Sequence, residues 1–237
     1  MMSRELLPGA LLKEHLASSI KQAIMQGRLA PGQRVIEGFW AREFGTAQAS
    51  VREAINLLIS EGFLVKDAGR SARVVSYCES DVARIYEVRG AMEGLAAQLA
   101  CSSRADLSAV GAAYERMEGA VRLRDMKSLI ESDLTFHLSL AEASGNPLVV
   151  DVLRRLLAPL FAFVQMRVIT SGQGPEAWKC DLPRHKLIIR LIREGNPVLA
   201  GQFVQHSLTQ FAASAYAVWE NVDGTGEAHK QVAGASA

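Results

Sequence analysis

The sequence predicts a mainly α-helical protein of two domains, in which an N-terminal winged helix-turn-helix precedes an antiparallel all-helical bundle. Two observations lead to this fold class. Short helical segments and two β-type runs around a basic hairpin occupy the chain before residue 76. Beyond residue 80 apolar residues recur at helical spacing almost throughout. We expect domains at 8–76 and 80–220, and a disordered tail at 221–237, where small and polar residues dominate.

The composition is that of an ordinary globular chain, with 237 residues of which 49% are hydrophobic and 22% charged. No apolar run approaches the roughly 18 residues that a membrane span needs. Charged residues also interrupt the start of the chain, where a secretory signal would be apolar. The cysteines Cys78, Cys101 and Cys180 are widely spaced, which favours reduced thiols. We therefore expect a cytoplasmic protein with no membrane partner.

The charge is distributed unevenly along the chain. Residues 1–77 contain 10 Lys+Arg and 7 Asp+Glu, a net charge of +3, whereas the remainder contains 16 and 18, a net charge of −2. A basic front domain suits a polyanionic partner, although a charge of +3 is weak support by itself.

The N-terminal segment divides into three helices and a hairpin. Apolar residues recur every four positions over 12–24, and Gly27 follows as a helix stop. A short helix is expected over 39–44, and a third helix has a packed apolar side over 51–59. Two β-type runs then flank the basic hairpin, at 63–65 and 73–75. This order is typical of a winged helix-turn-helix, although other three-helix units with a glycine turn share the pattern.

In a winged helix-turn-helix the third helix enters the major groove of DNA and its first residues reach the base edges. The wing contacts the phosphate backbone or the minor groove. Double-stranded DNA is therefore the expected partner. The residues expected to contact it are Gln48, Ala49, Ser50 and Arg52 of the third helix and Arg70 and Arg73 of the wing.

Several motifs resemble the N-terminal domain of the GntR-type bacterial transcription regulators. These are PGQRVIE, AREFG, SVREAINLLISEGFLV and SARVV, and the similarity covers roughly residues 10–76. The resemblance implies a homodimer that reads an inverted-repeat operator, with one recognition helix in each half-site.

The chain departs from that family at the positions that usually read DNA. Gly38 stands where an arginine is usual, Ala47 and Gln48 replace a Ser-Arg pair, and Ser71 replaces the wing glycine. Because arginine favours guanine and glutamine favours adenine, we expect an atypical operator. Arg52 is retained, and its alternative role is an ion pair with a neighbouring carboxylate on the same helix.

The second domain is expected to contain six helices joined by short loops. Gly145-Asn146-Pro147 marks one helix boundary, Pro159 a kink and Pro183 an interruption. The expected helices lie at 80–101, 107–123, 126–143, 147–170, 176–193 and 197–219.

Three histidines of this domain lie among apolar residues at helical spacing. Asp133 and His137 are four residues apart and share one helix face, while His185 and His206 belong to later helices. Burying these groups costs several kcal/mol, on the order of 2–7 for each polar group, unless they bond to one another or to an ion. Three imidazoles and one carboxylate suit Zn²⁺, Ni²⁺ or Mn²⁺. A surface Asp-His pair and hydrogen-bonded core histidines are the alternatives that the residues alone leave open.

Other motifs resemble the FCD effector domain of the FadR-type branch of GntR regulators. They are YEVRGAMEGLAAQLA, DLTFHLSLAEASGNPLV and HKLIIRLIREGNPVLAGQFVQH, and the similarity covers roughly residues 80–218. The resemblance implies that the metal ligands are Asp133, His137, His185 and His206. It also implies that Arg89 binds an effector carboxylate; a salt bridge to Glu93 is the alternative. Arg184 stands where many members have a glutamate.

We therefore expect a transcription regulator, a repressor by resemblance, whose bundle binds a small organic acid through a divalent metal. One alternative is a metal-responsive regulator in which the ion is the signal. Another is a metal-dependent hydrolase, which would need a general base that the metal motifs do not supply. The sequence has no P-loop, GxGxxG or GxSxG motif, so we expect no enzyme activity.

Overall fold

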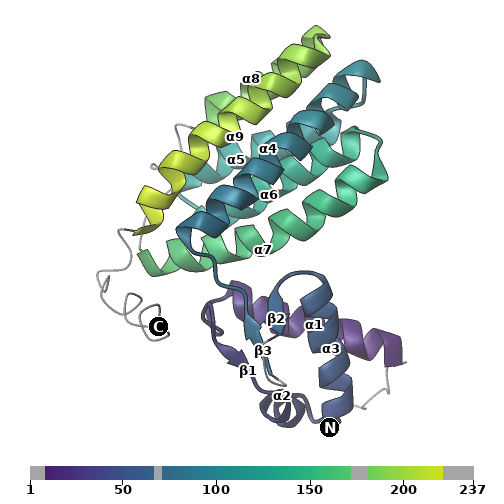
Figure 1. Ribbon diagram of the computed structural model, residues 1–237, viewed down its shortest axis with the longest axis vertical. Helices are drawn as coiled ribbons and strands as arrows, with labels where there is room; N and C mark the ends of the chain where they lie inside the picture. Colours follow the sequence, from purple (N-terminus) through teal and green to yellow (C-terminus); the bar gives the residue numbers. More distant parts are fainter. Residues whose placement is uncertain (1–8, 67–70, 172–180, 221–237) are drawn as a thin grey trace, which may run out of the picture.

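The structure is a computed structural model that describes residues 9–66, 71–171 and 181–220. It contains a small domain and a larger helical bundle, joined at the start of one long bundle helix (Figure 1). The small domain consists of α1 (Gly9–Met25), β1 (Arg34–Val35), α2 (Glu37–Phe44), α3 (Gln48–Ser60), β2 (Leu64–Lys66) and β3 (Ala72–Val74). The bundle consists of α4 (Glu79–Ser102), α5 (Ser108–Leu123), α6 (Met126–Ala143), α7 (Pro147–Ser171), α8 (Leu182–Glu194) and α9 (Pro197–Glu220).

The small domain has the winged helix-turn-helix order. Its described strands form an antiparallel sheet in the order β1-β3-β2, with Leu64 opposite Val74 and Arg34 opposite Arg73. The sequence predicted the β2-β3 hairpin, with the bounds of each strand displaced by one residue. It did not predict β1. That strand has only two residues and carries no alternating pattern, so its pairing with β3 is visible only in three dimensions.

The helices of the small domain pack through the apolar faces that the sequence indicated. Leu16 and Ile20 of α1 are buried against α3, where Val51 and Leu58 are also fully buried. Burying a side chain of this size contributes about 1.5–3 kcal/mol. Gly45 ends α2 with a φ of 59°, in the left-handed region where glycine costs least. This packing fixes α3 on the surface of the domain.

The first bundle helix begins one residue earlier than the expected start at residue 80. Cys78 is the N-cap of α4, and its backbone N–H donates to the Asp81 carboxylate at 3.1 Å. Asp81 reaches back in this way as the third residue of a capping box. Pro183 lies in the first turn of α8 and does not interrupt the helix. Residues 176–180, which were expected to begin this helix, lie outside the described residues.

Two bundle helices are held close by glycines. A Cβ at Gly94 of α4 would lie 3.0 Å from the carbonyl oxygen of Gly201 in α9, so only glycine allows this approach. The α4–α9 pair forms one side of the bundle and α7 lies nearest the small domain (Figure 1).

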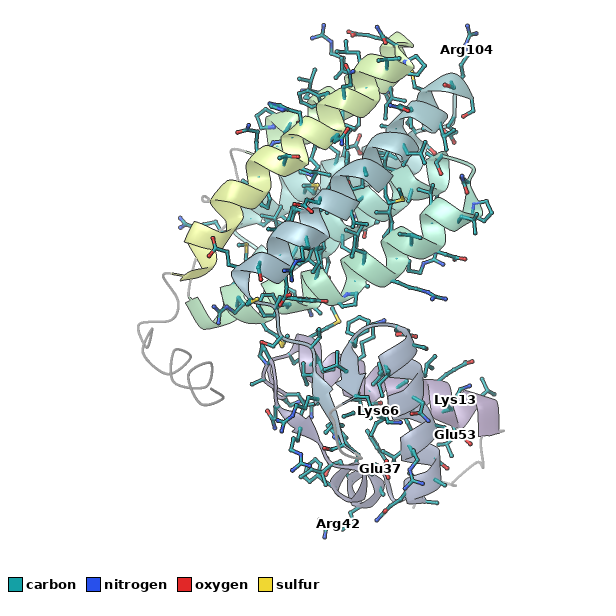
Figure 2. The ribbon with its side chains drawn as sticks, in the orientation of Figure 1. Lys13, Glu37, Arg42, Glu53, Lys66 and Arg104 are labelled. Carbon is teal, nitrogen blue, oxygen red and sulfur yellow. The ribbon has the colours of Figure 1, made fainter. Side chains whose placement is uncertain are left out.

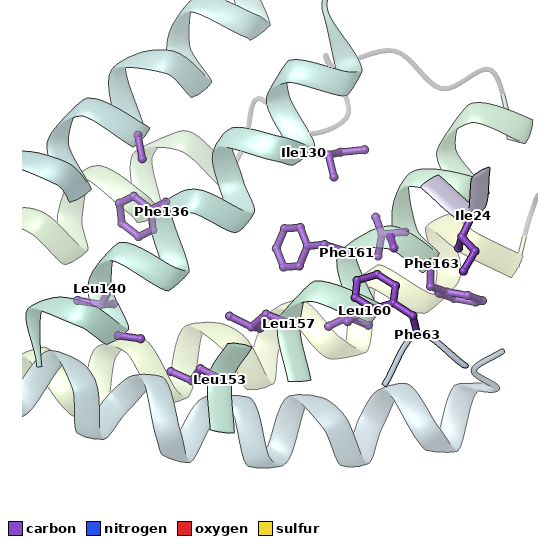
Figure 3. Packing of buried hydrophobic residues seen from close by; sticks show 14 of the residues in the cluster. Ile24, Phe63, Ile130, Phe136, Leu140, Leu153, Leu157, Leu160, Phe161 and Phe163 are labelled. Carbon is purple, nitrogen blue, oxygen red and sulfur yellow. The ribbon is translucent and has the colours of Figure 1, made fainter. Parts of the chain in front are cut away.

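The cores of the two domains meet at α7. Ile24 and Phe63 of the small domain belong to the same buried cluster as Leu160 and Phe163 of α7 (Figure 3). Tyr77, in the connection between the domains, packs edge-on against Phe163 with ring centroids 5.2 Å apart. Among the described residues, no helix combines the length and the apolar character needed to cross a membrane.

Candidate functional site

Three of the four expected metal ligands converge inside the bundle. Asp133 and His137 lie one turn apart on α6, and His185 faces them from α8. The Asp133 Oδ1 atom is 3.1 Å from Nε2 of His137 and 3.0 Å from Nε2 of His185. The two Nε2 atoms are 3.4 Å apart. All three side chains are buried, so each must satisfy its polar atoms within this cluster.

The opposite ring nitrogens of both histidines face acceptors. Nδ1 of His137 lies 2.5 Å from Oε2 of Glu93, and Nδ1 of His185 lies 2.9 Å from the carbonyl oxygen of Asp181. A neutral imidazole whose Nδ1–H faces an acceptor has its lone pair on Nε2. Both lone pairs then point to the centre of the cluster, which is the arrangement found around histidines that bind metal ions.

The distances fit a divalent ion. Ligand atoms about 2.0–2.2 Å from an ion lie roughly 2.8–3.6 Å from one another in tetrahedral or octahedral geometry. The three separations in this cluster fall in that range. Two imidazoles and a carboxylate suit Zn²⁺, Ni²⁺ or Mn²⁺, so the donor chemistry fits the expected metal as well.

Arg89 and Glu93 form a buried ion pair beside this cluster. Nε of Arg89 donates to Oε1 of Glu93 at 2.5 Å, and the two side chains are 3% and 0% exposed. Burial alone would raise the pKa of Glu93, but the charge of Arg89, followed by that of His137, lowers it to about 2. The salt bridge expected as the alternative role of Arg89 is therefore present. Glu93 remains a carboxylate that links Arg89 to His137.

The charges of the cluster also act on Asp133. When no ion is bound and the Nε2 atoms of His137 and His185 carry protons, burial tends to raise the pKa of this carboxyl, but hydrogen bonds from the two histidines outweigh burial and hold the pKa well below its usual range. Asp133 is therefore ionised, as a metal ligand must be.

A small cavity adjoins the three ligand atoms. Its volume is about 40 Å³, which is space for about three water molecules at about 10–15 Å³ each. The apolar part of its wall includes Leu160 and Phe161 of α7. Its charged and polar wall residues are Tyr86, Arg89, Glu93, Asp133, His137, Asp181, Arg184, His185 and Ser207. The cavity suits an ion with a small polar ligand and excludes a long acyl chain.

His206 does not join the other three ligands, which corrects the sequence prediction. Its side chain is exposed on α9, whereas Ser207 is buried and lines the cavity. Successive residues of a helix point about 100° apart, so only one of the two can face the site. The apolar spacing of Val204, Leu208 and Phe211 already places 207 on the inner face of the helix and 206 beside it.

Asp181 and Arg184 also line the site, although the sequence motifs did not predict a site role for Asp181 and marked Arg184 only as unusual. Arg184 contacts the Asp181 carboxylate at 2.5 Å and donates to the Ser207 carbonyl oxygen at 3.3 Å. Asp181 in turn accepts from His185 through its backbone, a contact that no residue type could have indicated.

The expected DNA-reading residues lie at the start of α3. Gln48 and Ala49 are exposed and Ser50 is half-buried. The side chain of Gln48 lies across Gly38 of α2, because a Cβ at Gly38 would be 3.3 Å from Nε2 of Gln48. Positions 38 and 48, at which this chain differs from the usual residues of the GntR-type regulators, are therefore neighbours in space. A larger residue at 38 would displace Gln48.

Arg52 is exposed but is paired with a carboxylate. Its guanidinium donates to both oxygens of Glu37 in α2, with distances of 2.8–3.1 Å. An ion pair was expected as the alternative role of Arg52, but within α3 rather than between two helices. The hydrogen bond and the charge of Glu37 raise the pKa of Arg52. Glu37 and Arg42 lie at the end of the small domain farthest from the bundle, which leaves this face open (Figure 2).

Of the two expected wing residues, Arg73 is described by the structure, and Arg70 lies outside the described residues. Arg73 is half-buried and its Nη1 donates to the carbonyl oxygen of Gly32 at 3.1 Å, so it also braces the turn before β1. Arg34 donates to the hydroxyl of Ser71, the residue that replaces the wing glycine.

Comparisons with known proteins agree with this architecture. Residues 12–74 match the family of bacterial regulatory proteins called gntR, and residues 84–210 match the FCD domain. A protein of Paenarthrobacter nicotinovorans named "Probable D-xylose utilization operon transcriptional repressor" is 28% identical over 86% of this chain and 88% of its own. The Glc operon transcriptional activator of Escherichia coli K12 is 27% identical over 79% of this chain and 82% of its own.

Solved structures show the same fold. A transcriptional regulator of the GntR type from Rhodococcus sp. RHA1 superposes with a TM-score of 0.73 at 20% identity, covering 87% of this chain and 98% of that one. McbR/YncC of E. coli gives a TM-score of 0.70 at 19% identity, covering 93% and 99%.

Proposed function

Because the chain belongs to the GntR family of bacterial regulatory proteins and has an FCD domain, we propose that its bundle site controls DNA binding by taking up a small carboxylate through a divalent metal. The family and the named relatives are transcription regulators and not enzymes, so the hydrolase alternative is set aside. Some relatives are named repressors, which favours repression for this chain as well.

The observation that carries this proposal is the convergence of Asp133 Oδ1 and the two histidine Nε2 atoms on one point. Asp133, His137 and His185 would hold the ion, and the ion would supply positive charge and open coordination positions for an oxygen ligand. Glu93 and the Asp181 carbonyl orient the two imidazoles.

The charge of the cavity wall supports a carboxylate as the ligand. Arg89 and Arg184 line the cavity together with the carboxylates of Glu93, Asp133 and Asp181. The two arginines and three carboxylates together carry a net charge of −1. A divalent ion brought in with neutral histidines changes the net charge of the cavity wall to +1, which favours a small anion. The small volume favours a short organic acid over a long acyl chain.

The DNA-binding face is the start of α3, where Gln48 would read bases and Arg52 would contact bases or phosphate. We propose a homodimer, since two recognition helices related by a twofold axis match an inverted-repeat operator. An operator on the bacterial chromosome places such a regulator in the cytoplasm.

A metal-responsive regulator is the second candidate, because a cavity of about 40 Å³ suits an ion with its waters alone. Titration of operator DNA with metal-free protein, with protein plus Zn²⁺, and with protein plus Zn²⁺ and an organic acid separates the two. A change in DNA affinity that requires the acid supports the proposed function. A full change with Zn²⁺ alone supports the metal-responsive alternative, and no change in either case contradicts both.

A further inference from the structure

Over the part of α9 whose side chains are described, residues 197–211, the inner face contributes no strong metal ligand to the site. Val204, Ser207 and Leu208 face the cavity, and the nearest histidine, His206, is exposed. Moving His206 inward would require α9 to rotate by about 100°. Such a rotation is opposed by the close contact of Gly201 with Gly94 of α4.

The three ligand atoms found in the site come from only two helices. Asp133 and His137 belong to α6 and His185 to α8, and each pair of ligand atoms is 3.0–3.4 Å apart. With an ion bound, these three mutually adjacent donors would leave its cavity-facing side to other ligands, and on that side α9 presents the hydroxyl-bearing Ser207. A neutral serine hydroxyl is a much weaker ligand for these ions than imidazole, thiolate or carboxylate.

We propose that this chain holds its ion with three protein ligands only, and that Ser207 occupies the place where a fourth would stand. The inference rests on the proposed metal-binding function of the same site. A site with three protein ligands leaves an additional position for water or for an oxygen of the organic ligand. It also releases its ion more readily than a site with four.

Cysteine substitutions at the two neighbouring positions test this inference. Ser207→Cys is nearly isosteric and introduces a thiolate, which binds Zn²⁺ and Co²⁺ strongly. His206→Cys is the matched control one residue away, and His206→Ala tests the histidine directly. The probes are Co²⁺, whose bond to a thiolate gives a near-ultraviolet charge-transfer band, and Zn²⁺, whose affinity is measured by competition with a chelator.

We expect Ser207→Cys to show the charge-transfer band and to bind Zn²⁺ roughly 10- to 100-fold more tightly than the unmodified protein. We expect His206→Cys to show no band beyond that of the unmodified protein, and His206→Ala to leave the Zn²⁺ affinity unchanged within about twofold. Circular dichroism checks that each variant is folded.

Two results would overturn the inference while leaving the metal site intact. One is a large loss of Zn²⁺ affinity in His206→Ala, or a band in His206→Cys, because His206 would then be a ligand. The other is normal Co²⁺ binding without a band in folded Ser207→Cys, because position 207 would then not adjoin the ion. If neither ion binds the unmodified protein or any variant, the proposed metal function itself fails.

Discussion

Gly62, which follows α3, lies against Pro159 of α7. A Cβ at Gly62 would lie 3.1 Å from Cγ of Pro159 and 3.4 Å from the carbonyl oxygen of Arg155. Leu160 and Phe161, the residues that follow Pro159, line the cavity of the metal site. One short stretch of α7 therefore contacts both the DNA-binding domain and the wall of the proposed effector site. A ligand that repositions this stretch can change the orientation of α3.

Gly62→Ala tests the tightness of this contact, and Gly27→Ala is its matched control. Both glycines have positive φ, 81° and 71°, so alanine costs about 1 kcal/mol of backbone strain at each. Only Gly62 has a neighbour in the way, since nothing lies within 4 Å of a Cβ at Gly27. We expect Gly62→Ala to lose about 1–3 kcal/mol more stability than Gly27→Ala in urea denaturation. Equal losses would show that the Pro159 contact is loose.

The buried ion pair makes a prediction about stability. Arg89→Ala leaves the carboxylate of Glu93 buried without its cation, so we expect a loss of about 3–5 kcal/mol in the free energy of unfolding. The double variant Arg89→Met with Glu93→Gln removes both charges and should regain at least half of that loss. Urea denaturation measures both variants. If the double variant is no more stable than Arg89→Ala, the cost does not arise from an unpaired Glu93.

Purified protein should carry about one divalent ion per chain, and His137→Ala should lose it. The reason is that His137 supplies one of three converging ligand atoms, and losing one of three leaves too few donors. Elemental analysis of protein prepared without chelators gives the content. His15→Ala, which alters a distant exposed histidine, is the control and should keep the ion. Retention of the ion by His137→Ala would place the metal elsewhere.

The DNA-binding face predicts distinct effects for two residues. Gln48→Arg should shift the preferred base at one position of each half-site from adenine towards guanine. Arg52→Ala should weaken binding. If Arg52 contacts a phosphate, a plot of log affinity against log salt concentration should become less steep by about one in Arg52→Ala. Selection from a randomised DNA pool, followed by salt titrations, measures both. An unchanged base preference in Gln48→Arg would mean that position 48 does not face the bases.

Local signals in the sequence predicted most of the helices. Helix α6 runs from Met126 to Ala143 as expected, because Asp125 caps its start and Gly145 follows its end. Strand β1 was missed because two residues carry no periodic pattern, and its partner lies almost 40 residues later. The expected fourth ligand, His206, is exposed in the structure, because the apolar spacing of α9 turns position 207 rather than 206 towards the cavity.

Contacts between distant segments could not be predicted from the sequence. The salt bridge of Arg52 with Glu37 joins two helices that only the packing of the domain brings together. The same holds for the support of His185 by the Asp181 carbonyl, since every residue has such an oxygen. The Arg89–Glu93 pair was foreseen because four residues on one helix are always neighbours. Its link to His137 of α6 was not.

The most direct test of the account is the affinity for operator DNA of metal-loaded and metal-free protein, measured with a panel of small organic acids. The DNA is a palindromic fragment from upstream of the protein's own gene. We predict that at least one small carboxylate changes the affinity of metal-loaded protein by at least roughly fivefold, a coupling free energy of about 1 kcal/mol or more. Removing the metal should abolish this response while DNA binding persists. An equal response of metal-free protein, or a response to long-chain or uncharged ligands alone, would contradict the account.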